Sequence, residues 1–244
     1  MELRFLALYP EQMNIYADRG NVLFLQRRCE WRGIDFAYAS AGPGEEFDPT
    51  AHDFIYLGGG QDRDQRVVAA DMVESKQVAM VEATGDGAVV LAVCGGYQLL
   101  GSSYQLDDES LPGLGLVDLK TVRSPGPRLI GNVAIEVDLG DGPRVLAGFE
   151  NHGGRTHLGA GAAALGKVLK GFGNNGEDGL EGVWLNNLIG TYLHGPLLPK
   201  NAWLADHLIA LALERRYGKR PELGALEDGL ERAAHESARR AALG

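Results

Sequence analysis

Residues 91–100 read LAVCGGYQLL: an apolar run leads into a cysteine, two glycines follow, and a second apolar run begins. This order is typical of a nucleophile elbow, where a strand turns sharply into a helix and presents a reactive side chain. The turn needs small neighbours, which Ala92, Gly95 and Gly96 are. A helix starting after Cys94 would favour the thiolate, and the Gly95 amide could stabilise an oxyanion. We therefore expect Cys94 to be a catalytic nucleophile.

A buried structural cysteine is the alternative interpretation of Cys94, because free cysteine is among the most buried residue types. The flanking glycines, and Gln98 four residues further on, favour catalysis. The other cysteine, Cys29, lies in a helix pattern between charged residues and has no glycine turn, so we expect it to be incidental. Two cysteines in 244 residues give no disulfide framework and fit a reducing compartment.

Strand-like and helix-like segments alternate through the first hundred residues. Apolar runs predict buried strands at 3–8, 34–39, 54–57 and 88–93. Helix patterns cover 20–32 and 62–84, the latter long enough for two pieces. This alternation predicts an α/β fold with a mostly parallel sheet flanked by helices. Ligand sites in such sheets lie beyond the carboxyl ends of the strands.

The pattern changes from about residue 112, where glycines and short strand-like runs dominate. Runs at 131–137, 145–149, 183–184 and 188–193 predict antiparallel additions to the same sheet or a small second layer. Helix patterns return at 199–217 and 222–242. We expect one domain over 1–218 and a helical C-terminal extension over 219–244. The last helix could dock a partner, but a solvated amphipathic helix is the favoured interpretation.

Composition indicates a globular enzyme rather than a nucleic-acid-binding protein. The net charge is -10, hydrophobic residues make up 45% and charged residues 23%. The N-terminus lacks the features of a signal peptide, and no apolar run approaches the roughly 20 residues that span a bilayer. We therefore expect a cytoplasmic protein.

A cysteine nucleophile needs a base, and His194 is the best candidate. It follows the apolar run 188–193 and precedes Gly195, so it lies at a strand end, as Cys94 does. His152 is second, with a loop histidine held by hydrogen bonds as the alternative. We expect no base among the remaining histidines, which are His52, His157, His207 and His235. No metal site is expected, because His152 and His157 lack convincing further ligands.

Four motifs in order carry a family resemblance: GGG at 58–60, CGGYQ at 94–98, GFENHGGRT at 148–156 and YLHGP at 192–196. Together they resemble the class I glutamine amidotransferases, most closely the cobyric-acid-synthase-like branch. Within that branch, LALYPEQMNIYADRGN at 6–21 and RLIGN at 128–132 are similar to the GatD-type glutaminase subunits of lipid II isoglutaminyl synthase. The resemblance covers residues 3 to about 215.

The resemblance implies roles for individual residues. Cys94 matches the family nucleophile and His194 the family histidine. Arg128 matches the position that holds glutamine, and a guanidinium suits a carboxylate; a solvent-facing strand residue is the alternative. We place Gln98 beside the substrate. The Gly59 amide is expected to join that of Gly95 in the oxyanion hole.

One position departs from the wider class. Many class I amidotransferases place an acid two residues after the histidine to orient it, and this chain has Pro196 there. We therefore expect another acid to orient His194, either in this chain or donated by a partner.

The resemblance also implies a partner, a Mur-ligase-like subunit called MurT, in a heterodimer. That partner would use ATP and Mg to activate D-glutamate of the lipid II stem peptide, and ammonia released from glutamine would make D-isoglutamine. Lipid II would then bring the pair to the inner face of the membrane. We expect no cofactor in this chain: GAAALGK at 161–167 imitates a phosphate-binding loop, but Val168 follows where Ser or Thr would bind magnesium.

Three alternatives stay open. The chain could serve another synthetase, such as one that amidates a corrinoid precursor, with the same Cys94 and His194. It could be an unrelated Cys-His hydrolase with an ester or peptide substrate. It could also be a non-enzymatic binding subunit that keeps an elbow-like turn.

Overall fold

The computed structural model describes residues 1–15, 18–106 and 108–244. Its central sheet has six strands in the order β13-β14-β4-β3-β1-β2. These strands are β1 (Glu2–Leu8), β2 (Asp35–Ala41), β3 (Phe54–Leu57), β4 (Val89–Val93), β13 (Val183–Leu185) and β14 (Leu188–Thr191). Neighbours run parallel except for β13 and β14, which are antiparallel. The predicted α/β fold with a mostly parallel sheet is confirmed.

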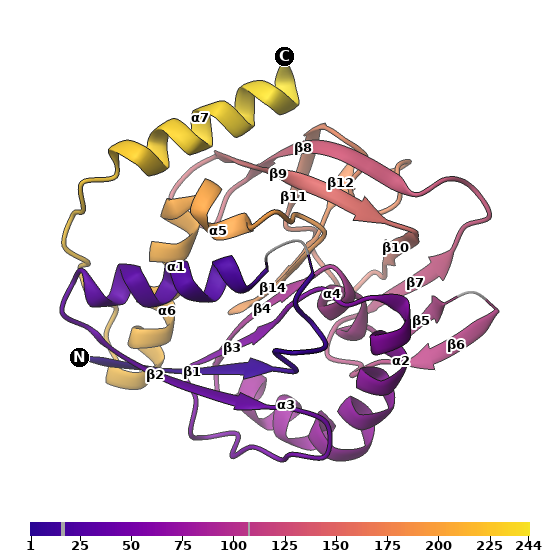
Figure 1. The fold of residues 1–244 in the computed structure, drawn as a ribbon, viewed down its shortest axis with the longest axis horizontal. Helices are drawn as coiled ribbons and strands as arrows, with labels where there is room; N and C mark the ends of the chain where they lie inside the picture. Colours follow the sequence, from indigo (N-terminus) through magenta and orange to yellow (C-terminus); the bar gives the residue numbers. More distant parts are fainter. Residues whose placement is uncertain (16–17, 107) are drawn as a thin grey trace.

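Helices cover both faces of this sheet (Figure 1). One face carries α1 (Arg19–Glu30), α5 (Leu197–Lys200) and α6 (Ala202–Tyr217). The other carries the predicted long helix in three pieces, namely α2 (Asp62–Asp71), the π-helix η1 (Met72–Lys76) and α3 (Gln77–Gly85). Every residue of β3 and β4 is buried, which explains why both read as continuous apolar runs rather than alternating ones.

Two further four-stranded sheets follow the elbow. One, in the order β12-β11-β8-β9, contains β8 (Leu129–Val137), β9 (Arg144–His152), β11 (Gly166–Lys170) and β12 (Leu180–Glu181). The other, in the order β10-β7-β5-β6, contains β5 (Ser103–Leu106), β6 (Glu109–Pro112), β7 (Leu119–Arg123) and β10 (Gly154–Leu158).

The observed sheets can be compared with the strands that the sequence predicts for the second half of the chain. The runs at 131–137 and 145–149 form a second layer, and 183–184 is an antiparallel addition to the central sheet. The expectation that 188–193 is antiparallel was wrong for β14, which runs parallel to β4. Between these two strands the chain builds both extra sheets, so it returns to the edge of β4 in the same direction. The sheet of β5, β6, β7 and β10 was not predicted.

The C-terminal helix α7 (Gly229–Leu243) lies along β8 and β9 and beside α5 (Figure 1). The Asn132 side chain donates a hydrogen bond to the Ala241 carbonyl (3.1 Å), and His235 Nδ1 donates to the Lys200 carbonyl (2.8 Å). One face of α7 therefore packs on the protein, while most of its residues are not buried. The division of the chain at residue 218 stays a prediction.

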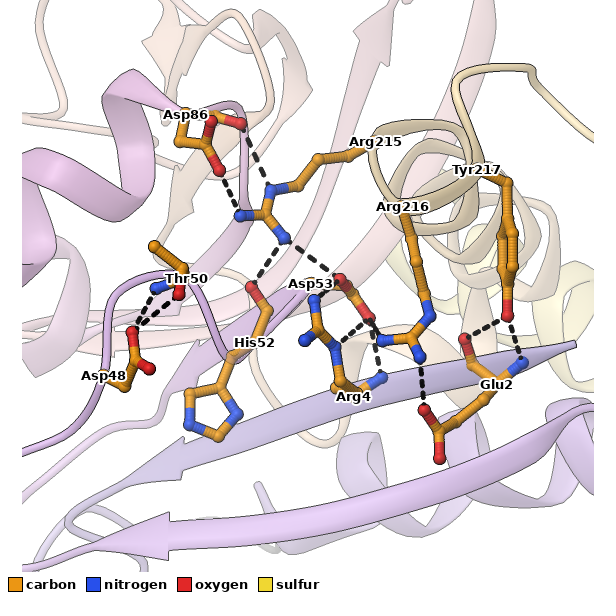
Figure 2. A network of polar contacts seen from close by, with 10 residues as sticks. All are labelled: Glu2, Arg4, Asp48, Thr50, His52, Asp53, Asp86, Arg215, Arg216 and Tyr217. Carbon is orange, nitrogen blue, oxygen red and sulfur yellow. Dashed lines mark hydrogen bonds and ion pairs between the residues drawn. The ribbon is translucent and has the colours of Figure 1, made fainter.

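Ion pairs connect α6 to the amino ends of β1 and β3 (Figure 2). The elbow follows the carboxyl end of β4, at the opposite edge of these parallel strands. The buried carboxylate of Asp53 pairs with Arg4 (2.7 Å), Arg215 (3.0 Å) and Arg216 (3.4 Å). The His52 carbonyl accepts a further bond from Arg215 (3.1 Å). His52 thus lies at the end of the sheet far from Cys94, which agrees with the expectation that it is not the base. Within the described residues, no helix has the length and apolar character to cross a bilayer.

A fully buried arginine joins three helices. The guanidinium of Arg28 on α1 donates to Asp206 on α6 (2.5 Å) and to Asp228 (2.8 Å), the residue that precedes α7. Both aspartates keep about a quarter of their side-chain surface exposed, 26% and 24%. Because a buried ion pair is costly to break from one side only, Arg28 should matter for stability.

Replacing Arg28 with Met should lower the free energy of unfolding by about 3 kcal/mol, since Asp228 loses its ion pair with Arg28 and Asp206 keeps only its pair with Arg32. Urea denaturation would measure the loss. Arg27→Met is the matched control on the same helix: its pair with Glu30 is exposed, and such pairs contribute about 1 kcal/mol or less. Equal losses for the two variants would contradict this account of Arg28.

Candidate active site

The predicted strand–cysteine–helix turn is present. Cys94 separates β4 from the short helix α4 (Gly95–Leu99) and has φ 53° and ψ -106°. A positive φ is strained for a residue with a side chain and is common at functional sites. The Cys94 amide donates to the Thr191 carbonyl (2.8 Å) and the Gly96 amide to the Gly58 carbonyl (3.0 Å). The turn is therefore held by the neighbouring strand ends on both sides.

Close packing explains why the residues after Cys94 are glycines. A Cβ on Gly96 would lie 2.6 Å from the Leu57 carbonyl oxygen, and a Cβ on Gly95 would lie 2.6 Å from Gln65 Nε2. Backbone cannot give way as a flexible side chain can, so the requirement for glycine is strictest at 96.

His194 meets Cys94 from the adjacent strand end, as expected. Its backbone pairs with Phe149, the His194 amide donating to the Phe149 carbonyl (2.7 Å). Its side chain is fully buried. Burial lowers the pKa of His194, but the charge and hydrogen bond of Cys94 and the carboxylate of Asp18 outweigh burial and raise it to about 10. The surroundings of His194 therefore favour its protonated, imidazolium form at neutral pH.

Asp18 is an acid within the chain that contacts His194. Its Oδ1 lies 3.5 Å from His194 Nδ1, and its Oδ2 accepts the Gly59 amide at 2.8 Å. The carboxylate is fully buried. Pro196, where the wider class has an acid, packs on the first turn of α1: a Cβ on Gly20 would lie 2.8 Å from Pro196 Cγ. This contact brings the start of α1, and with it Asp18, beside His194.

In the glycine run after β3, the amides of Gly59 and Gly60 have different surroundings. The Gly59 amide, expected in the oxyanion hole, donates to Asp18 in this arrangement. The Gly60 nitrogen lies 3.2 Å from the point where a Cβ on Gly95 would lie, and the Gly60 carbonyl accepts a bond from Gln65 Nε2 (3.0 Å). Gly60 rather than Gly59 thus lies beside the first amide of α4.

A pocket opens over Cys94, and both expected substrate-binding residues line it. Gln98 donates to the Tyr192 hydroxyl (3.2 Å). Arg128 is exposed, and its Nε and Nη2 donate to the side-chain and main-chain oxygens of Asn151 (2.8 and 2.9 Å). The structure therefore gathers Cys94, Gln98 and Arg128 around one space, with the guanidinium held in a fixed orientation.

His152 lies in the same pocket but is held in place by other groups. Its Nδ1 donates to the Gly154 carbonyl (2.8 Å), and its ring stacks on Tyr192 with centroids 3.6 Å apart. Burial lowers its pKa, and Glu150 only partly opposes this. A neutral histidine fixed by a hydrogen bond, at the end of β9, fits these contacts. Cys29 lies elsewhere in the core, where burial raises its pKa to about 12.

Sequence reasoning missed three side chains of the site: Asp18, Gln65 and Arg123, the last two of which line the pocket. An acid directly before a helix normally suggests an N-cap, yet Asp18 makes no side-chain cap bond. No signal separates Gln65 from other polar residues of its helix or Arg123 from other strand-end arginines.

Known proteins resemble this chain in sequence over most of its length. The CobB/CobQ-like glutamine amidotransferase domain matches residues 5–202. The GatD subunit of lipid II isoglutaminyl synthase (glutamine-hydrolyzing) from Streptococcus pneumoniae is 38% identical, covering 96% of this chain and 90% of that protein. Its namesake from Staphylococcus aureus is 40% identical, covering 88% and 86%. A probable cobyric acid synthase from Methanopyrus kandleri is 37% identical, covering 53% and 29%.

Solved structures are similar in fold. PurLQS from Thermotoga maritima superposes with a TM-score of 0.55 at 19% identity, covering 80% of this chain and 88% of that one. The glutaminase domain of Trypanosoma brucei CTPS with bound acivicin gives 0.53 at 12% identity, covering 91% and 96%. These two structures show similarity of fold alone. The sequence matches show that the chain belongs to the CobB/CobQ-like family and is a glutamine amidotransferase.

Proposed function

We propose that this chain is the glutaminase subunit of a lipid II isoglutaminyl synthase. The main support is the extent of the matches: the two relatives with that name align over 90% and 86% of their own lengths. The cobyric acid synthase of M. kandleri aligns over only 29% of its length. Amidation of a corrinoid precursor is therefore the weaker alternative.

In the proposed mechanism, the Cys94 thiolate attacks the side-chain carbonyl carbon of glutamine. The oxyanion receives hydrogen bonds from the Gly95 amide and from one amide of the glycine run, and the geometry favours Gly60 over Gly59. His194 gives its proton to the leaving ammonia, which leaves a thioester on Cys94. The neutral His194 then takes a proton from water as that water attacks the thioester, and glutamate leaves.

Asp18 acts in this scheme as a positioning residue. Its contact with Nδ1 of His194 favours the ring orientation in which Nε2 serves the reacting groups. It also holds the Gly59 amide, so one carboxylate ties the histidine to the glycine run. An acid donated by a partner is the alternative, and the 3.5 Å separation leaves room for the contact to tighten when substrate binds.

Ammonia must reach a second active site before water protonates it, so the scheme needs a partner. We assign ATP and Mg to a Mur-ligase-like subunit of the MurT type, which would activate the D-glutamate carboxyl group of lipid II. The phosphate-loop-like residues 161–167 do not compete for this role: Gly166–Lys170 is strand β11 rather than the start of a helix. Lipid II would bring the pair to the membrane surface.

Changing Cys94 to Ser should reduce glutamine hydrolysis by the complex with its partner at least about a thousandfold, since the nucleophile is lost. In the unchanged protein, a glutamine-analogue chloroketone should alkylate Cys94, which peptide mass spectrometry would locate. Cys29→Ser is the control and should retain labelling and turnover. A wild-type complex that resists the chloroketone would count against an amidotransferase role for Cys94.

Replacing Asp18 with Asn should reduce kcat for glutamine roughly ten- to a hundredfold by misorienting His194. Asp18 is also one of the causes that raise the pKa of His194. Its removal should lower that pKa, so the imidazolium is lost at lower pH and the alkaline limb of the pH–rate profile moves down. An unchanged alkaline limb together with full kcat would assign the orienting acid to the partner.

Co-purified with its Mur-ligase-like partner, the chain should amidate lipid II when glutamine, ATP and Mg are supplied. With Cys94→Ser in place of the wild-type chain, ammonium salts should still support amidation while glutamine should not. Mass spectrometry of the muropeptide would report the small mass decrease that accompanies replacement of the carboxyl OH of D-glutamate by NH2. Amidation of a corrinoid precursor instead would favour the alternative.

A further inference from the structure

A second guanidinium shares the pocket with Arg128. Arg123 is the last residue of β7, opposite Gly154 of β10, and it lines the same space as Cys94. Its Nη1 lies 2.2 Å from the point where a Cβ on Gly153 would be, which is possible because glycine has no side chain. Arg128 Nη1 lies 3.5 Å from the same point. The two arginines therefore direct their tips to one place, over Gly153.

Like charges so close together repel each other, which calls for an anion between them. A third arginine, Arg155, adds positive charge near this pair. Burial lowers the pKa of Arg155, and the charge of Arg123 lowers it further. Arg155 itself is engaged by backbone, since it donates to the Gly153 carbonyl (3.1 Å) and the Pro127 carbonyl (2.8 Å). Along the described parts of the chain, the pocket is lined by no carboxylate.

We propose that Arg123 and Arg128 together bind the α-carboxylate of glutamine; this inference rests on the function proposed above. Arg128 is fixed through Nε and Nη2, which leaves Nη1 for the ligand. Arg123 approaches the same carboxylate from β7. Two guanidinium groups can satisfy both carboxylate oxygens with charge-assisted hydrogen bonds.

The pair makes a free α-carboxylate a requirement for binding. Glutamine within a peptide, or with an amidated carboxyl group, would leave two guanidinium groups without an anion. Arg123 is thus a specificity residue that selects the free amino acid. Gly153 supports this role indirectly, because any side chain there would push the Arg123 tip away.

The test compares glutamine with its α-carboxamide, glutamine amide, as substrates of the complex with the partner subunit. Arg123→Met should raise KM for glutamine roughly ten- to a hundredfold with kcat within about twofold. It should leave kcat/KM for glutamine amide unchanged. Gly153→Ala, which keeps the arginine but displaces its tip, should show the same pattern in weaker form. Arg27→Met, an exposed arginine on α1, is the matched control and should change neither.

An unchanged KM for glutamine in an active Arg123→Met complex would overturn the inference, and so would equal effects on glutamine and glutamine amide. Both results leave the proposed function intact. Failure of the wild-type complex to hydrolyse glutamine, or of the chloroketone to label Cys94 while iodoacetamide does, would overturn the proposed function and this inference with it.

Discussion

The backbone turn at Cys94 is the constraint on which the site depends. A positive φ at a residue with a side chain costs about 1–3 kcal/mol and persists only where the surroundings enforce it. Here the enforcement comes from both neighbouring strands: the Cys94 amide is bound by Thr191 beyond one edge of β4, and the Gly96 amide by Gly58 beyond the other. The fully buried strands β3 and β4 supply the rigidity. The thiol consequently lies where three carboxyl strand ends converge, within reach of the histidine that follows β14.

If Asp18 has the positioning role proposed above, the same convergence explains how the chain can lack an acid next to its histidine. Pro196 packs on Gly20 instead, and the contact fixes the start of α1 against the end of β14. Asp18, which precedes α1, is thereby held at the histidine from a position 176 residues away in sequence. Its second oxygen binds the glycine run, so a displacement of that run and a displacement of the histidine cannot be independent. The acid acts on the geometry of the nucleophile's surroundings as well as on one imidazole.

Local features of the sequence predicted the parts of this structure that depend on local physics. Apolar runs located β1, β3 and β4, and the cysteine between small residues located the turn. The direction of β14 depends on the path of the long excursion before it, which no local pattern encodes. The sheet of β5, β6, β7 and β10 escaped notice because its strands are short and mix polar with apolar residues, as in Ser103–Leu106. The places of Asp18 and Arg123 in the site were not predicted for a related reason. Each lies beside a segment that is distant in sequence: Asp18 contacts His194, and the tip of Arg123 lies over the backbone of Gly153.

Charge in the site changes as the proposed reaction proceeds, and this lets one histidine serve two opposite steps. While Cys94 carries negative charge, the pKa of His194 is raised to about 10, so the ring holds the proton that the leaving ammonia needs. Acylation of the sulfur removes that negative charge. One of the causes that raise the pKa then disappears, whereas the burial that lowers it remains. The pKa of His194 therefore falls in the thioester state, and this change favours transfer of a proton from water to the ring. The contact of Asp18 with Nδ1 does not involve the sulfur, so the histidine stays oriented while its proton affinity follows the chemistry on Cys94.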